Sequence, residues 1–213
     1  MARDIAARAG QLLVRIREEA GPIAPDDKAA LKALRDKADS ESNDLITAAL
    51  TLADGDALLS EEGVDDESRL DAQRVWIVDP LDGTWEYGQG RADFGVHIAL
   101  WDMGRKEMLL GVVDLPAQGL VRTSGDVDPE LPMLPGDRPL RIVASRTRPP
   151  ADLDGICARL AERLGQEVEV VNVGSVGAKV NEILLGNAEA YLHDTGFYEW
   201  DLAAPLAVAK HYG

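Results

Sequence analysis

The stretch RVWIVDPLDGTWEYGQG, residues 74–90, decides both the fold and the chemistry of this chain. Val75 to Val78 form an apolar run, which predicts a buried strand. Asp79 and Asp82 lie where that strand ends. Two carboxylates so close together repel each other unless a cation or a shared proton lies between them. We therefore expect a cation or a proton to be bound at the end of a core strand.

The DPLDGT segment, residues 79–84, also suits phosphate binding. Pro80 fixes one backbone angle, so the chain turns sharply and the carbonyl of Leu81 can face the same side as the acids. Gly83 permits close approach, and the amides of Gly83 and Thr84 can bind a phosphate oxygen if a helical turn begins there. The Thr84 hydroxyl can orient a water molecule. Carboxylates beside free amides indicate metal-assisted hydrolysis of a phosphate ester.

Other acids lie at the ends of other predicted elements. Glu61 and Glu62 follow a short strand, and Asp201 opens a helix. Taken singly, these acids also fit a solvated loop and a helix cap. Carboxylates without a nearby histidine or cysteine pair favour Mg²⁺ or Mn²⁺ over zinc. The three histidines show no ligand spacing and are interpreted as structural: His97, His193 and His211. The D-x-D-x-T pattern of phosphoaspartate phosphatases is disfavoured, because these aspartates are three apart rather than two.

The bulk composition narrows the class of protein. The chain has 213 residues, of which 46% are hydrophobic and 28% charged, as expected for a globular protein with a substantial core. A net charge of −16 disfavours nucleic acid and anionic membranes as partners. The single cysteine, Cys157, is interpreted as a helical core residue, and the lack of a pair fits a reducing cytoplasm. No apolar run is long enough for a membrane span.

Hydrophobic spacing predicts helices and strands along the whole chain. A helix over 3–20 should end at Gly21, and the polar segment 37–44 should turn before a second helix capped by Ser42 or Asn43. Strands are then expected over 57–59, 75–78, 94–102, 108–116 and 119–124. After a proline-rich boundary at 124–139, strands over 140–145, 167–174 and 188–193 alternate with helices over 152–164, 176–185 and 201–211. This α/β pattern predicts two subdomains, 1–135 and 136–213.

Four segments together resemble the inositol monophosphatase superfamily of Mg²⁺-dependent, lithium-sensitive phosphatases. They are WIVDPLDGT (76–84), EWDLAAPLAVAKHYG (199–213), LLSEEG (58–63) and GSVGAKVNEILLGNAEAYLH (174–193). The resemblance implies an α/β (α+β) fold, the layered αβαβα sandwich of the inositol monophosphatase and fructose-1,6-bisphosphatase type. Members continue past the last of these motifs, so we expect the natural chain to extend beyond Gly213.

The resemblance also implies roles for individual residues. Glu61, Asp79 and the Leu81 carbonyl would hold one Mg²⁺, and Asp79, Asp82 and Asp201 a second, with a third weaker ion near Glu61 and Mn²⁺ as a possible substitute. Thr84 with Asp39 would orient the attacking water, with Glu61 also catalytic; Asp36 and Asp44 are rivals of Asp39. Substrate would contact the following residues: Gly83, Thr84, Gly174, Ser175 and Lys179. Asp82→Asn should lower the rate by orders of magnitude yet leave the fold intact or firmer, because it relieves a repulsion.

The residues after DGT favour one branch of the superfamily. DGTWEY (82–87) is similar to the D-G-T-x-E-F of CysQ-type 3′(2′),5′-bisphosphate nucleotidases, which cleave the 3′-phosphate of adenosine 3′,5′-bisphosphate, a by-product of sulfate assimilation. The second phosphate needs its own cations: Lys179 is the first candidate, with Arg91, Arg146 and Arg148 behind it. The alternatives are an inositol-1-phosphate or broad sugar-phosphate phosphatase and a non-catalytic metal- or phosphate-binding regulator. We also expect the chain to act on a small phosphorylated substrate, to form a homodimer and to reside in the cytoplasm.

Overall fold

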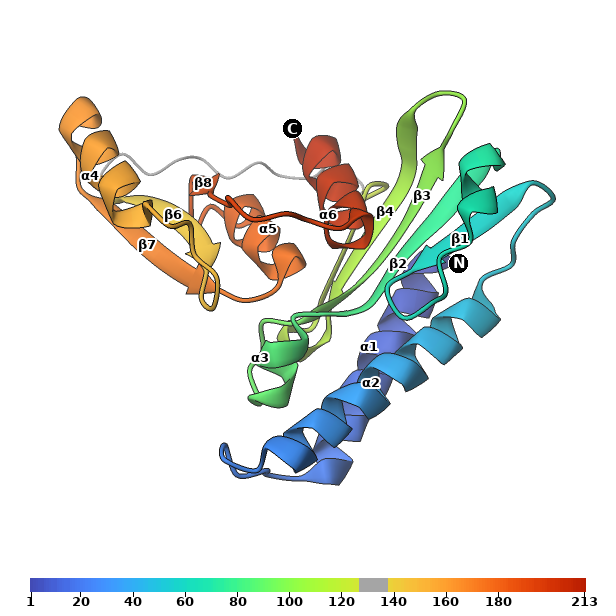
Figure 1. Cartoon of the computed structure of the whole chain (residues 1–213). Coiled ribbons are helices and arrows are strands. Elements are labelled where there is room, and N and C mark those ends of the chain that lie inside the picture. Colours follow the sequence, from blue (N-terminus) through green and yellow to red (C-terminus); the bar gives the residue numbers. More distant parts are fainter. Residues whose placement is uncertain (127–137) are drawn as a thin grey trace.

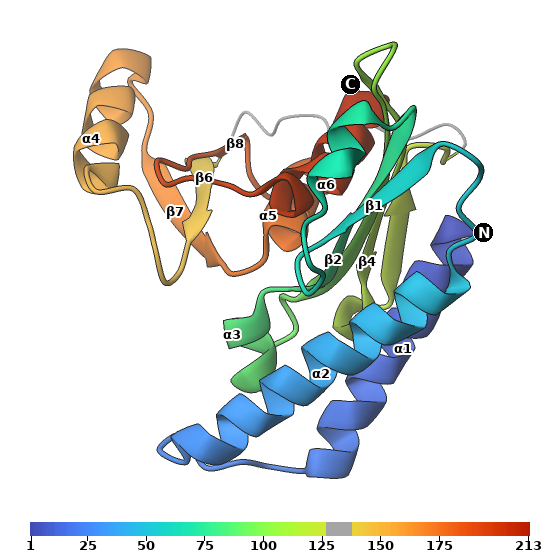
Figure 2. The same ribbon diagram turned by 45° about the vertical axis from the view of Figure 1, so that its right-hand side comes forward.

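The computed structural model describes residues 1–126 and 138–213, and its elements form alternating layers of helices and sheets (Figure 1). The first layer is a pair of long helices, α1 (Ala2–Ala20) and α2 (Lys28–Ala49), which Figure 2 shows side by side across one face of the larger sheet. On its other face lie α5 (Val176–Leu184) and α6 (Glu199–Tyr212), followed by a smaller sheet and α4 (Leu153–Leu164). The predicted αβαβα sandwich is confirmed.

The larger sheet has the strand order β1-β2-β3-β4-β5. Its strands are β1 (Asp56–Ser60), β2 (Arg74–Asp82), β3 (Gly95–Asp102), β4 (Glu107–Leu115) and β5 (Leu120–Thr123). Only the β1–β2 pair among these is parallel, and its register sets Ser60 opposite Val78. The next residue along each chain is an acid, so Glu61 and Asp79 lie side by side at the point where β1 ends.

The smaller sheet has the order β7-β6-β8, with all pairs parallel. Its strands are β6 (Leu140–Ser145), β7 (Val168–Val173) and the short β8 (Ala190–Tyr191). The remaining short helices are α3 (Thr84–Gly88) and two 3₁₀ turns, η1 (Glu67–Asp71) and η2 (Pro116–Gln118). Because the carboxyl ends of parallel strands meet at one edge, the segments after β6 and β7 lie together there, next to α3 (Figure 1).

Two hydrophobic clusters hold these layers together. One fills the space between the larger sheet and α1 and α2, and the other joins the opposite face of that sheet to α5, α6 and the smaller sheet. α6 approaches β4 closely at Gly111, where a Cβ atom would lie 2.5 Å from the Cβ of Ala207. Glycine and alanine at this crossing therefore let the helix lie directly on the sheet, which places the first turn of α6 near the end of β2.

The predicted turn at 37–44 is wrong, because α2 runs unbroken from Lys28 to Ala49. No proline or glycine interrupts the segment, and Asp27 caps the helix by accepting from the amide of Ala30 at 3.0 Å. Ser42 is not a cap. It is fully buried, and its hydroxyl donates to the carbonyl of Pro80 at 2.8 Å, which ties the helix to the exit of β2. Cys157 is half-buried on α4 rather than in the core.

The predicted boundary between residues 135 and 136 lies outside the described residues, as does most of the proline-rich segment at 124–139. The division into two subdomains therefore stays a prediction. None of the helices within 1–126 and 138–213 is long and apolar enough to cross a membrane.

Candidate functional site

The end of β2 carries two buried carboxylates: Asp79 is 1% exposed and Asp82 7%. Residues three apart on a regular strand face opposite sides of the sheet. Here the pairing with β3 is irregular, since Asp79 lies opposite His97 while Asp82 lies opposite Gly95. The extra residue is accommodated by a bulge, which lets both carboxylates line the same cavity.

That cavity has a volume of about 490 Å³ and lies between the end of the larger sheet, the smaller sheet and α6. It collects most of the residues that the sequence singled out: Glu61, Asp79, Leu81, Asp82, Gly83, Thr84, Gly174, Lys179 and Asp201. Asp201 lies in the first turn of α6 and also caps that helix, because one of its oxygens accepts from the amide of Tyr198 at 2.8 Å. The capping role and the position in the cavity are therefore compatible.

Burial and mutual repulsion raise the pKa of three of the four acids. Asp79 has its pKa raised well above the ordinary value, first by burial and then by the charges of Asp82 and Glu61. Partial desolvation in the cavity and the charge of Asp201 raise the pKa of Glu61 to about 7, although the residue lies in an exposed loop. The pKa of Asp201 is raised by burial and by Asp82. Three acids at this site are thus poorly compensated.

Asp82 differs, because its pKa is lowered despite burial. His97 Nε2 lies 3.2 Å from Asp82 Oδ2, the amide of Gly177 donates to the same oxygen at 2.9 Å, and the charge of Lys179 favours the ionised form. The contact with His97 is close but poorly aligned for a hydrogen bond. These contacts favour the opposite of the sequence-based expectation for Asp82, since Asp79 is the less compensated of the two carboxylates.

The donor set suits a hard divalent cation. It consists of carboxylate oxygens, with the Leu81 carbonyl beside them, and it lies in a cavity where negative charge exceeds positive. One oxygen of each buried aspartate accepts from a backbone amide, Asp79 Oδ1 from Leu81 at 3.0 Å and Asp82 Oδ2 from Gly177 at 2.9 Å, and the Asp79 carboxyl also shares a hydrogen bond with Glu61. As the side chains stand, no three acids, histidines or cysteines among the described residues converge tightly enough to hold an ion.

Two of the predicted site residues do not line the cavity. Ser175 is buried as the cap of α5, with its hydroxyl accepting from the amide of Ala178 at 2.9 Å. Asp39 lies on α2 behind Glu61 and Glu62, and its pKa is raised to about 8 by partial burial and by those two acids. Its rivals Asp36 and Asp44 are exposed, and Asp36 pairs with Lys32. Asp39 is therefore the acid of this segment that faces the cluster.

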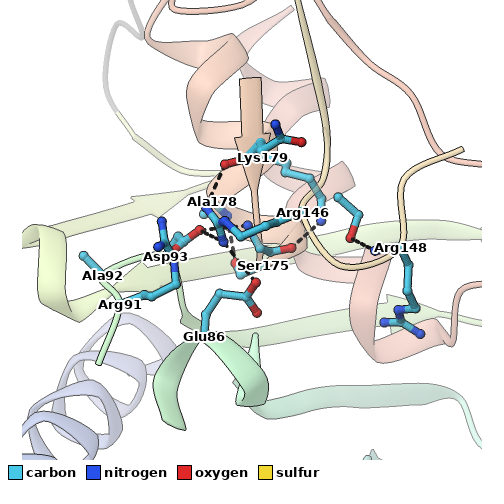
Figure 3. Close-up of polar contacts among 12 residues, drawn as sticks. Glu86, Arg91, Ala92, Asp93, Arg146, Arg148, Ser175, Ala178 and Lys179 are labelled. Atoms are coloured by element: carbon cyan, nitrogen blue, oxygen red, sulfur yellow. Dashed lines mark hydrogen bonds and ion pairs between the residues drawn. The ribbon is translucent and has the colours of Figure 1, made fainter. Parts of the chain in front are cut away.

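The segment before α5 is held from several sides (Figure 3). Gly174 donates its amide to Asp93 Oδ2 at 2.8 Å, and its carbonyl accepts from the ammonium of Lys179. Glu86, which is buried, packs so closely that a Cβ atom on Gly174 would lie 2.0 Å from its Cδ. Glycine is therefore required here, and the Gly174 amide is already engaged within the protein.

Sequence patterns missed one wall of the cavity, which we call the aromatic wall and define by Tyr191, His193, Phe197 and Tyr198. His193 and Phe197 stack with ring centres 3.6 Å apart and an angle of 16° between them. The Tyr191 ring meets Phe197 edge-on at 6.4 Å. The available signal was the density of aromatic residues between 191 and 200, just before Asp201. His97 and His193, interpreted as structural, lie beside Asp82 and in this wall respectively.

Comparison with known proteins gives consistent matches. The sequence model of the inositol monophosphatase family matches residues 1–213. The 3′-phosphoadenosine 5′-phosphate phosphatase of Mycobacterium leprae is 44% identical, with 100% of this chain and 78% of that protein covered. The 3′(2′),5′-bisphosphate nucleotidase CysQ of Escherichia coli O157:H7 is 30% identical, with 99% and 86% covered. The crystal structure of CysQ from Bacteroides thetaiotaomicron has a TM-score of 0.74 at 27% identity, with 100% of this chain and 85% of that chain covered.

Proposed function

The chain belongs to the inositol monophosphatase family, and we propose that it removes the 3′-phosphate from adenosine 3′,5′-bisphosphate, and from its phosphosulfate analogue, with Mg²⁺ as cofactor. The relatives named as phosphatases of 3′-phosphoadenosine 5′-phosphate and as CysQ nucleotidases support this substrate. Mn²⁺ would substitute for Mg²⁺, and two or three ions would bind per site.

One observation carries the preference for a nucleotide over inositol phosphate: the aromatic wall and the carboxylates face the same cavity. A nucleobase has a flat π face that stacks on aromatic side chains, worth about 1–3 kcal/mol per base. An inositol ring has no such face. A substrate whose phosphate is at the carboxylates can therefore place its base against Tyr191, His193 and Phe197, whereas inositol phosphate leaves this wall uncovered.

The four acids have assigned positions in the proposed site. Glu61, Asp79 and the Leu81 carbonyl would hold one Mg²⁺, and Asp79, Asp82 and Asp201 the second. Bound Mg²⁺ lowers the pKa of a coordinated water and neutralises charge on the phosphoryl group. His97 and Gly177 keep Asp82 ionised for this purpose, and the repulsion that raises the pKa of Asp79 is relieved when the cations bind.

Thr84 and its acidic neighbours would orient the attacking water. The Thr84 hydroxyl donates to the carbonyl of Leu81 at 3.1 Å, so its oxygen is left to accept a hydrogen bond from that water. Asp39, which lies behind Glu61 on α2, would assist Thr84 in orienting that water, as the family resemblance implies. The backbone amides of Gly83 and Thr84, at the start of α3, would contact a phosphate oxygen together with Lys179.

The cellular setting is part of the same proposal. Lithium sensitivity, a role in sulfate assimilation, a cytoplasmic location and a homodimeric state are the properties that this family resemblance implies for the chain. An acidic surface, at a net charge of −16, agrees with a small phosphorylated substrate rather than a nucleic acid polymer.

The test compares kcat/KM for adenosine 3′,5′-bisphosphate, its phosphosulfate analogue and inositol 1-phosphate, with Mg²⁺ and with a chelator. We expect Mg²⁺-dependent release of the 3′-phosphate and a preference for the nucleotides of at least about tenfold. A tenfold preference for inositol phosphate would identify the alternative phosphatase. Binding of the nucleotide without any turnover would identify a non-catalytic regulator instead.

A further inference from the structure

A bisphosphate substrate presents two phosphates, and this inference rests on the function proposed above. The carboxylates and their cations serve the phosphate that is cleaved. The retained phosphate needs a cation of the protein that faces the cavity and is not already neutralised. Lys179, Arg91, Arg146 and Arg148 are the candidates from the sequence, and the structure separates them.

Arg146 is fully engaged in a cluster behind the cavity wall. Its Nη1 lies 2.7 Å from Asp93 Oδ2 and 3.1 Å from Glu86 Oε1, and its Nη2 donates to the carbonyl of Asn172 at 2.7 Å. Arg91 pairs with the other oxygen of Asp93 at 2.9 Å. Neither arginine lines the cavity. Both arginines are therefore engaged in holding the segment before α5 in place.

Lys179 lines the cavity but is partly committed. The side chain is 3% exposed, and its ammonium donates to the Gly174 carbonyl and lies 5.1 Å from the centre of the Tyr191 ring. The charges of Asp82 and Glu86 also act on this ammonium. Because Lys179 is buried, its ammonium suits a phosphate held at the carboxylate end of the cavity, whereas Arg148 lies at an exposed position of the lining.

Among the described residues, Arg148 is the cation that faces the cavity without being neutralised by the protein. It follows β6 by three residues and lines the cavity together with Ser145 and Thr147. Its backbone amide donates to Ser145 Oγ at 3.2 Å, which anchors the loop. Across residues 1–126 and 138–213, its guanidinium has no ion-pair or hydrogen-bond partner. Figure 3 shows its side chain extending away from the cluster around Arg146.

The location of Arg148 suits a group attached to the far side of the substrate. Arg148 lines the same cavity as the aromatic wall and Asp201. We propose that the Arg148 guanidinium binds the phosphate that is not cleaved, the 5′-phosphate of adenosine 3′,5′-bisphosphate, and thereby selects bisphosphates over monophosphates. A guanidinium presents paired N–H donors that match two phosphate oxygens, which an ammonium cannot do.

The test uses two substrates that differ only in that phosphate, adenosine 3′,5′-bisphosphate and adenosine 3′-monophosphate. For Arg148→Met we expect kcat/KM for the bisphosphate to fall about 10- to 100-fold, mainly through KM, and kcat/KM for the monophosphate to change by less than threefold. Arg148→Lys should recover part of the loss. Arg163→Met, which removes an exposed arginine of α4 outside the cavity, is the matched control and should change neither value.

The outcomes separate this inference from the function on which it rests. Equal losses for both substrates, or no loss for the bisphosphate, would overturn the assignment of Arg148 while leaving the nucleotidase intact. Failure of the unaltered protein to hydrolyse either adenosine substrate would overturn the proposed function, and this inference with it.

Discussion

His97 Nε2 lies 3.2 Å from Oδ2 of Asp82, with both side chains buried at the end of β2. Because of this contact, the two neighbouring aspartates differ in how well their negative charge is stabilised. Asp82 is stabilised as an anion by His97, by the Gly177 amide and by Lys179, whereas the pKa of Asp79 is raised well above its ordinary value. The imidazole is farther from Asp79, at 4.0 Å between Nδ1 and Oδ2. Of the two carboxylates, Asp79 is therefore the one whose ionisation is unfavourable.

This difference predicts opposite changes in stability for two isosteric variants, Asp79→Asn and Asp82→Asn. Both should lower kcat by orders of magnitude. In metal-free buffer at pH 8, Asp79→Asn should raise the melting temperature by a few degrees, because it removes a carboxyl whose ionisation is disfavoured by burial and by the charges of Asp82 and Glu61. Asp82→Asn should lower stability by roughly 1–3 kcal/mol, because His97 and Lys179 lose their anion. Thermal unfolding in EDTA measures both. A stabilising Asp82→Asn would refute the division of roles.

Asp39 is predicted to be the acid of α2 that assists the water. Asp39→Asn should lower kcat by at least about 10²-fold, the usual contribution of a general base. The matched variant Asp36→Asn removes an exposed acid one turn earlier, which pairs with Lys32, and should stay within twofold of the unaltered protein. Steady-state kinetics at saturating Mg²⁺ distinguishes them. Similar rates for both variants would show that neither acid acts on the water.

Gly174 and Glu86 are predicted to be energetically coupled. Gly174→Ala should lower kcat/KM about 10- to 100-fold, because its Cβ would lie 2.0 Å from Glu86 Cδ and one of the two must move. Removing the obstructing side chain in Gly174→Ala/Glu86→Ala should cost less than the sum of the single changes. Gly104→Ala is the control, since its Cβ would meet nothing closer than 3.4 Å. Strict additivity in this double-mutant cycle would mean that the contact does not position the loop.

Asp114 on β4 is predicted to destabilise the protein at alkaline pH. Its side chain is 3% exposed and faces the close approach of α1 at Gly10, and Oδ2 has no hydrogen-bond partner among the described residues. Burial raises its pKa to about 7, so the folded state binds a proton more tightly than the unfolded state, and stability falls as pH rises from about 4 to 7.

Asp114→Asn should therefore stabilise the protein at pH 8 by up to roughly 4 kcal/mol, with a smaller gain at pH 5.5. Urea unfolding at the two pH values measures the difference. Asp44→Asn, at an exposed position of α2, serves as the control and should show no such gain. A variant at Asp114 that is less stable than the unaltered protein at pH 8 would contradict the assignment.

Local patterns in the sequence were sufficient for most elements, because the apolar run of β2 and the helical spacing of α1 are properties of short segments. They failed at α2, where Ser42 looked like a cap but instead donates to Pro80, a residue 38 positions away. They also could not rank Arg91, Arg146 and Arg148. That ranking depends on which arginine meets Asp93 and Glu86, and such contacts follow from the register of strands far apart in the sequence.

The bulge between Asp79 and Asp82 also depends on the register of strands, which local sequence patterns do not reveal. Spacing alone sets these side chains on opposite faces of a strand, and only the pairing with His97 and Gly95 brings them to one side. The aromatic wall was missed because each of its members, seen in sequence, is equally compatible with packing in a core. The acids that line the cavity were found because they stand at the ends of predicted elements, and the motif resemblance added their roles.

The most direct test of a cation bridging these acids is an anomalous-difference map from crystals soaked in Mn²⁺, with the Asp79→Asn variant as the control. We predict peaks in the cavity about 2.1 Å from oxygens of Asp79 and Asp82, with Glu61 or Asp201 as further ligands, and weaker or absent peaks in the variant. A map with no peak in the cavity, or with ions bound only at surface acids, would contradict the metal-dependent site.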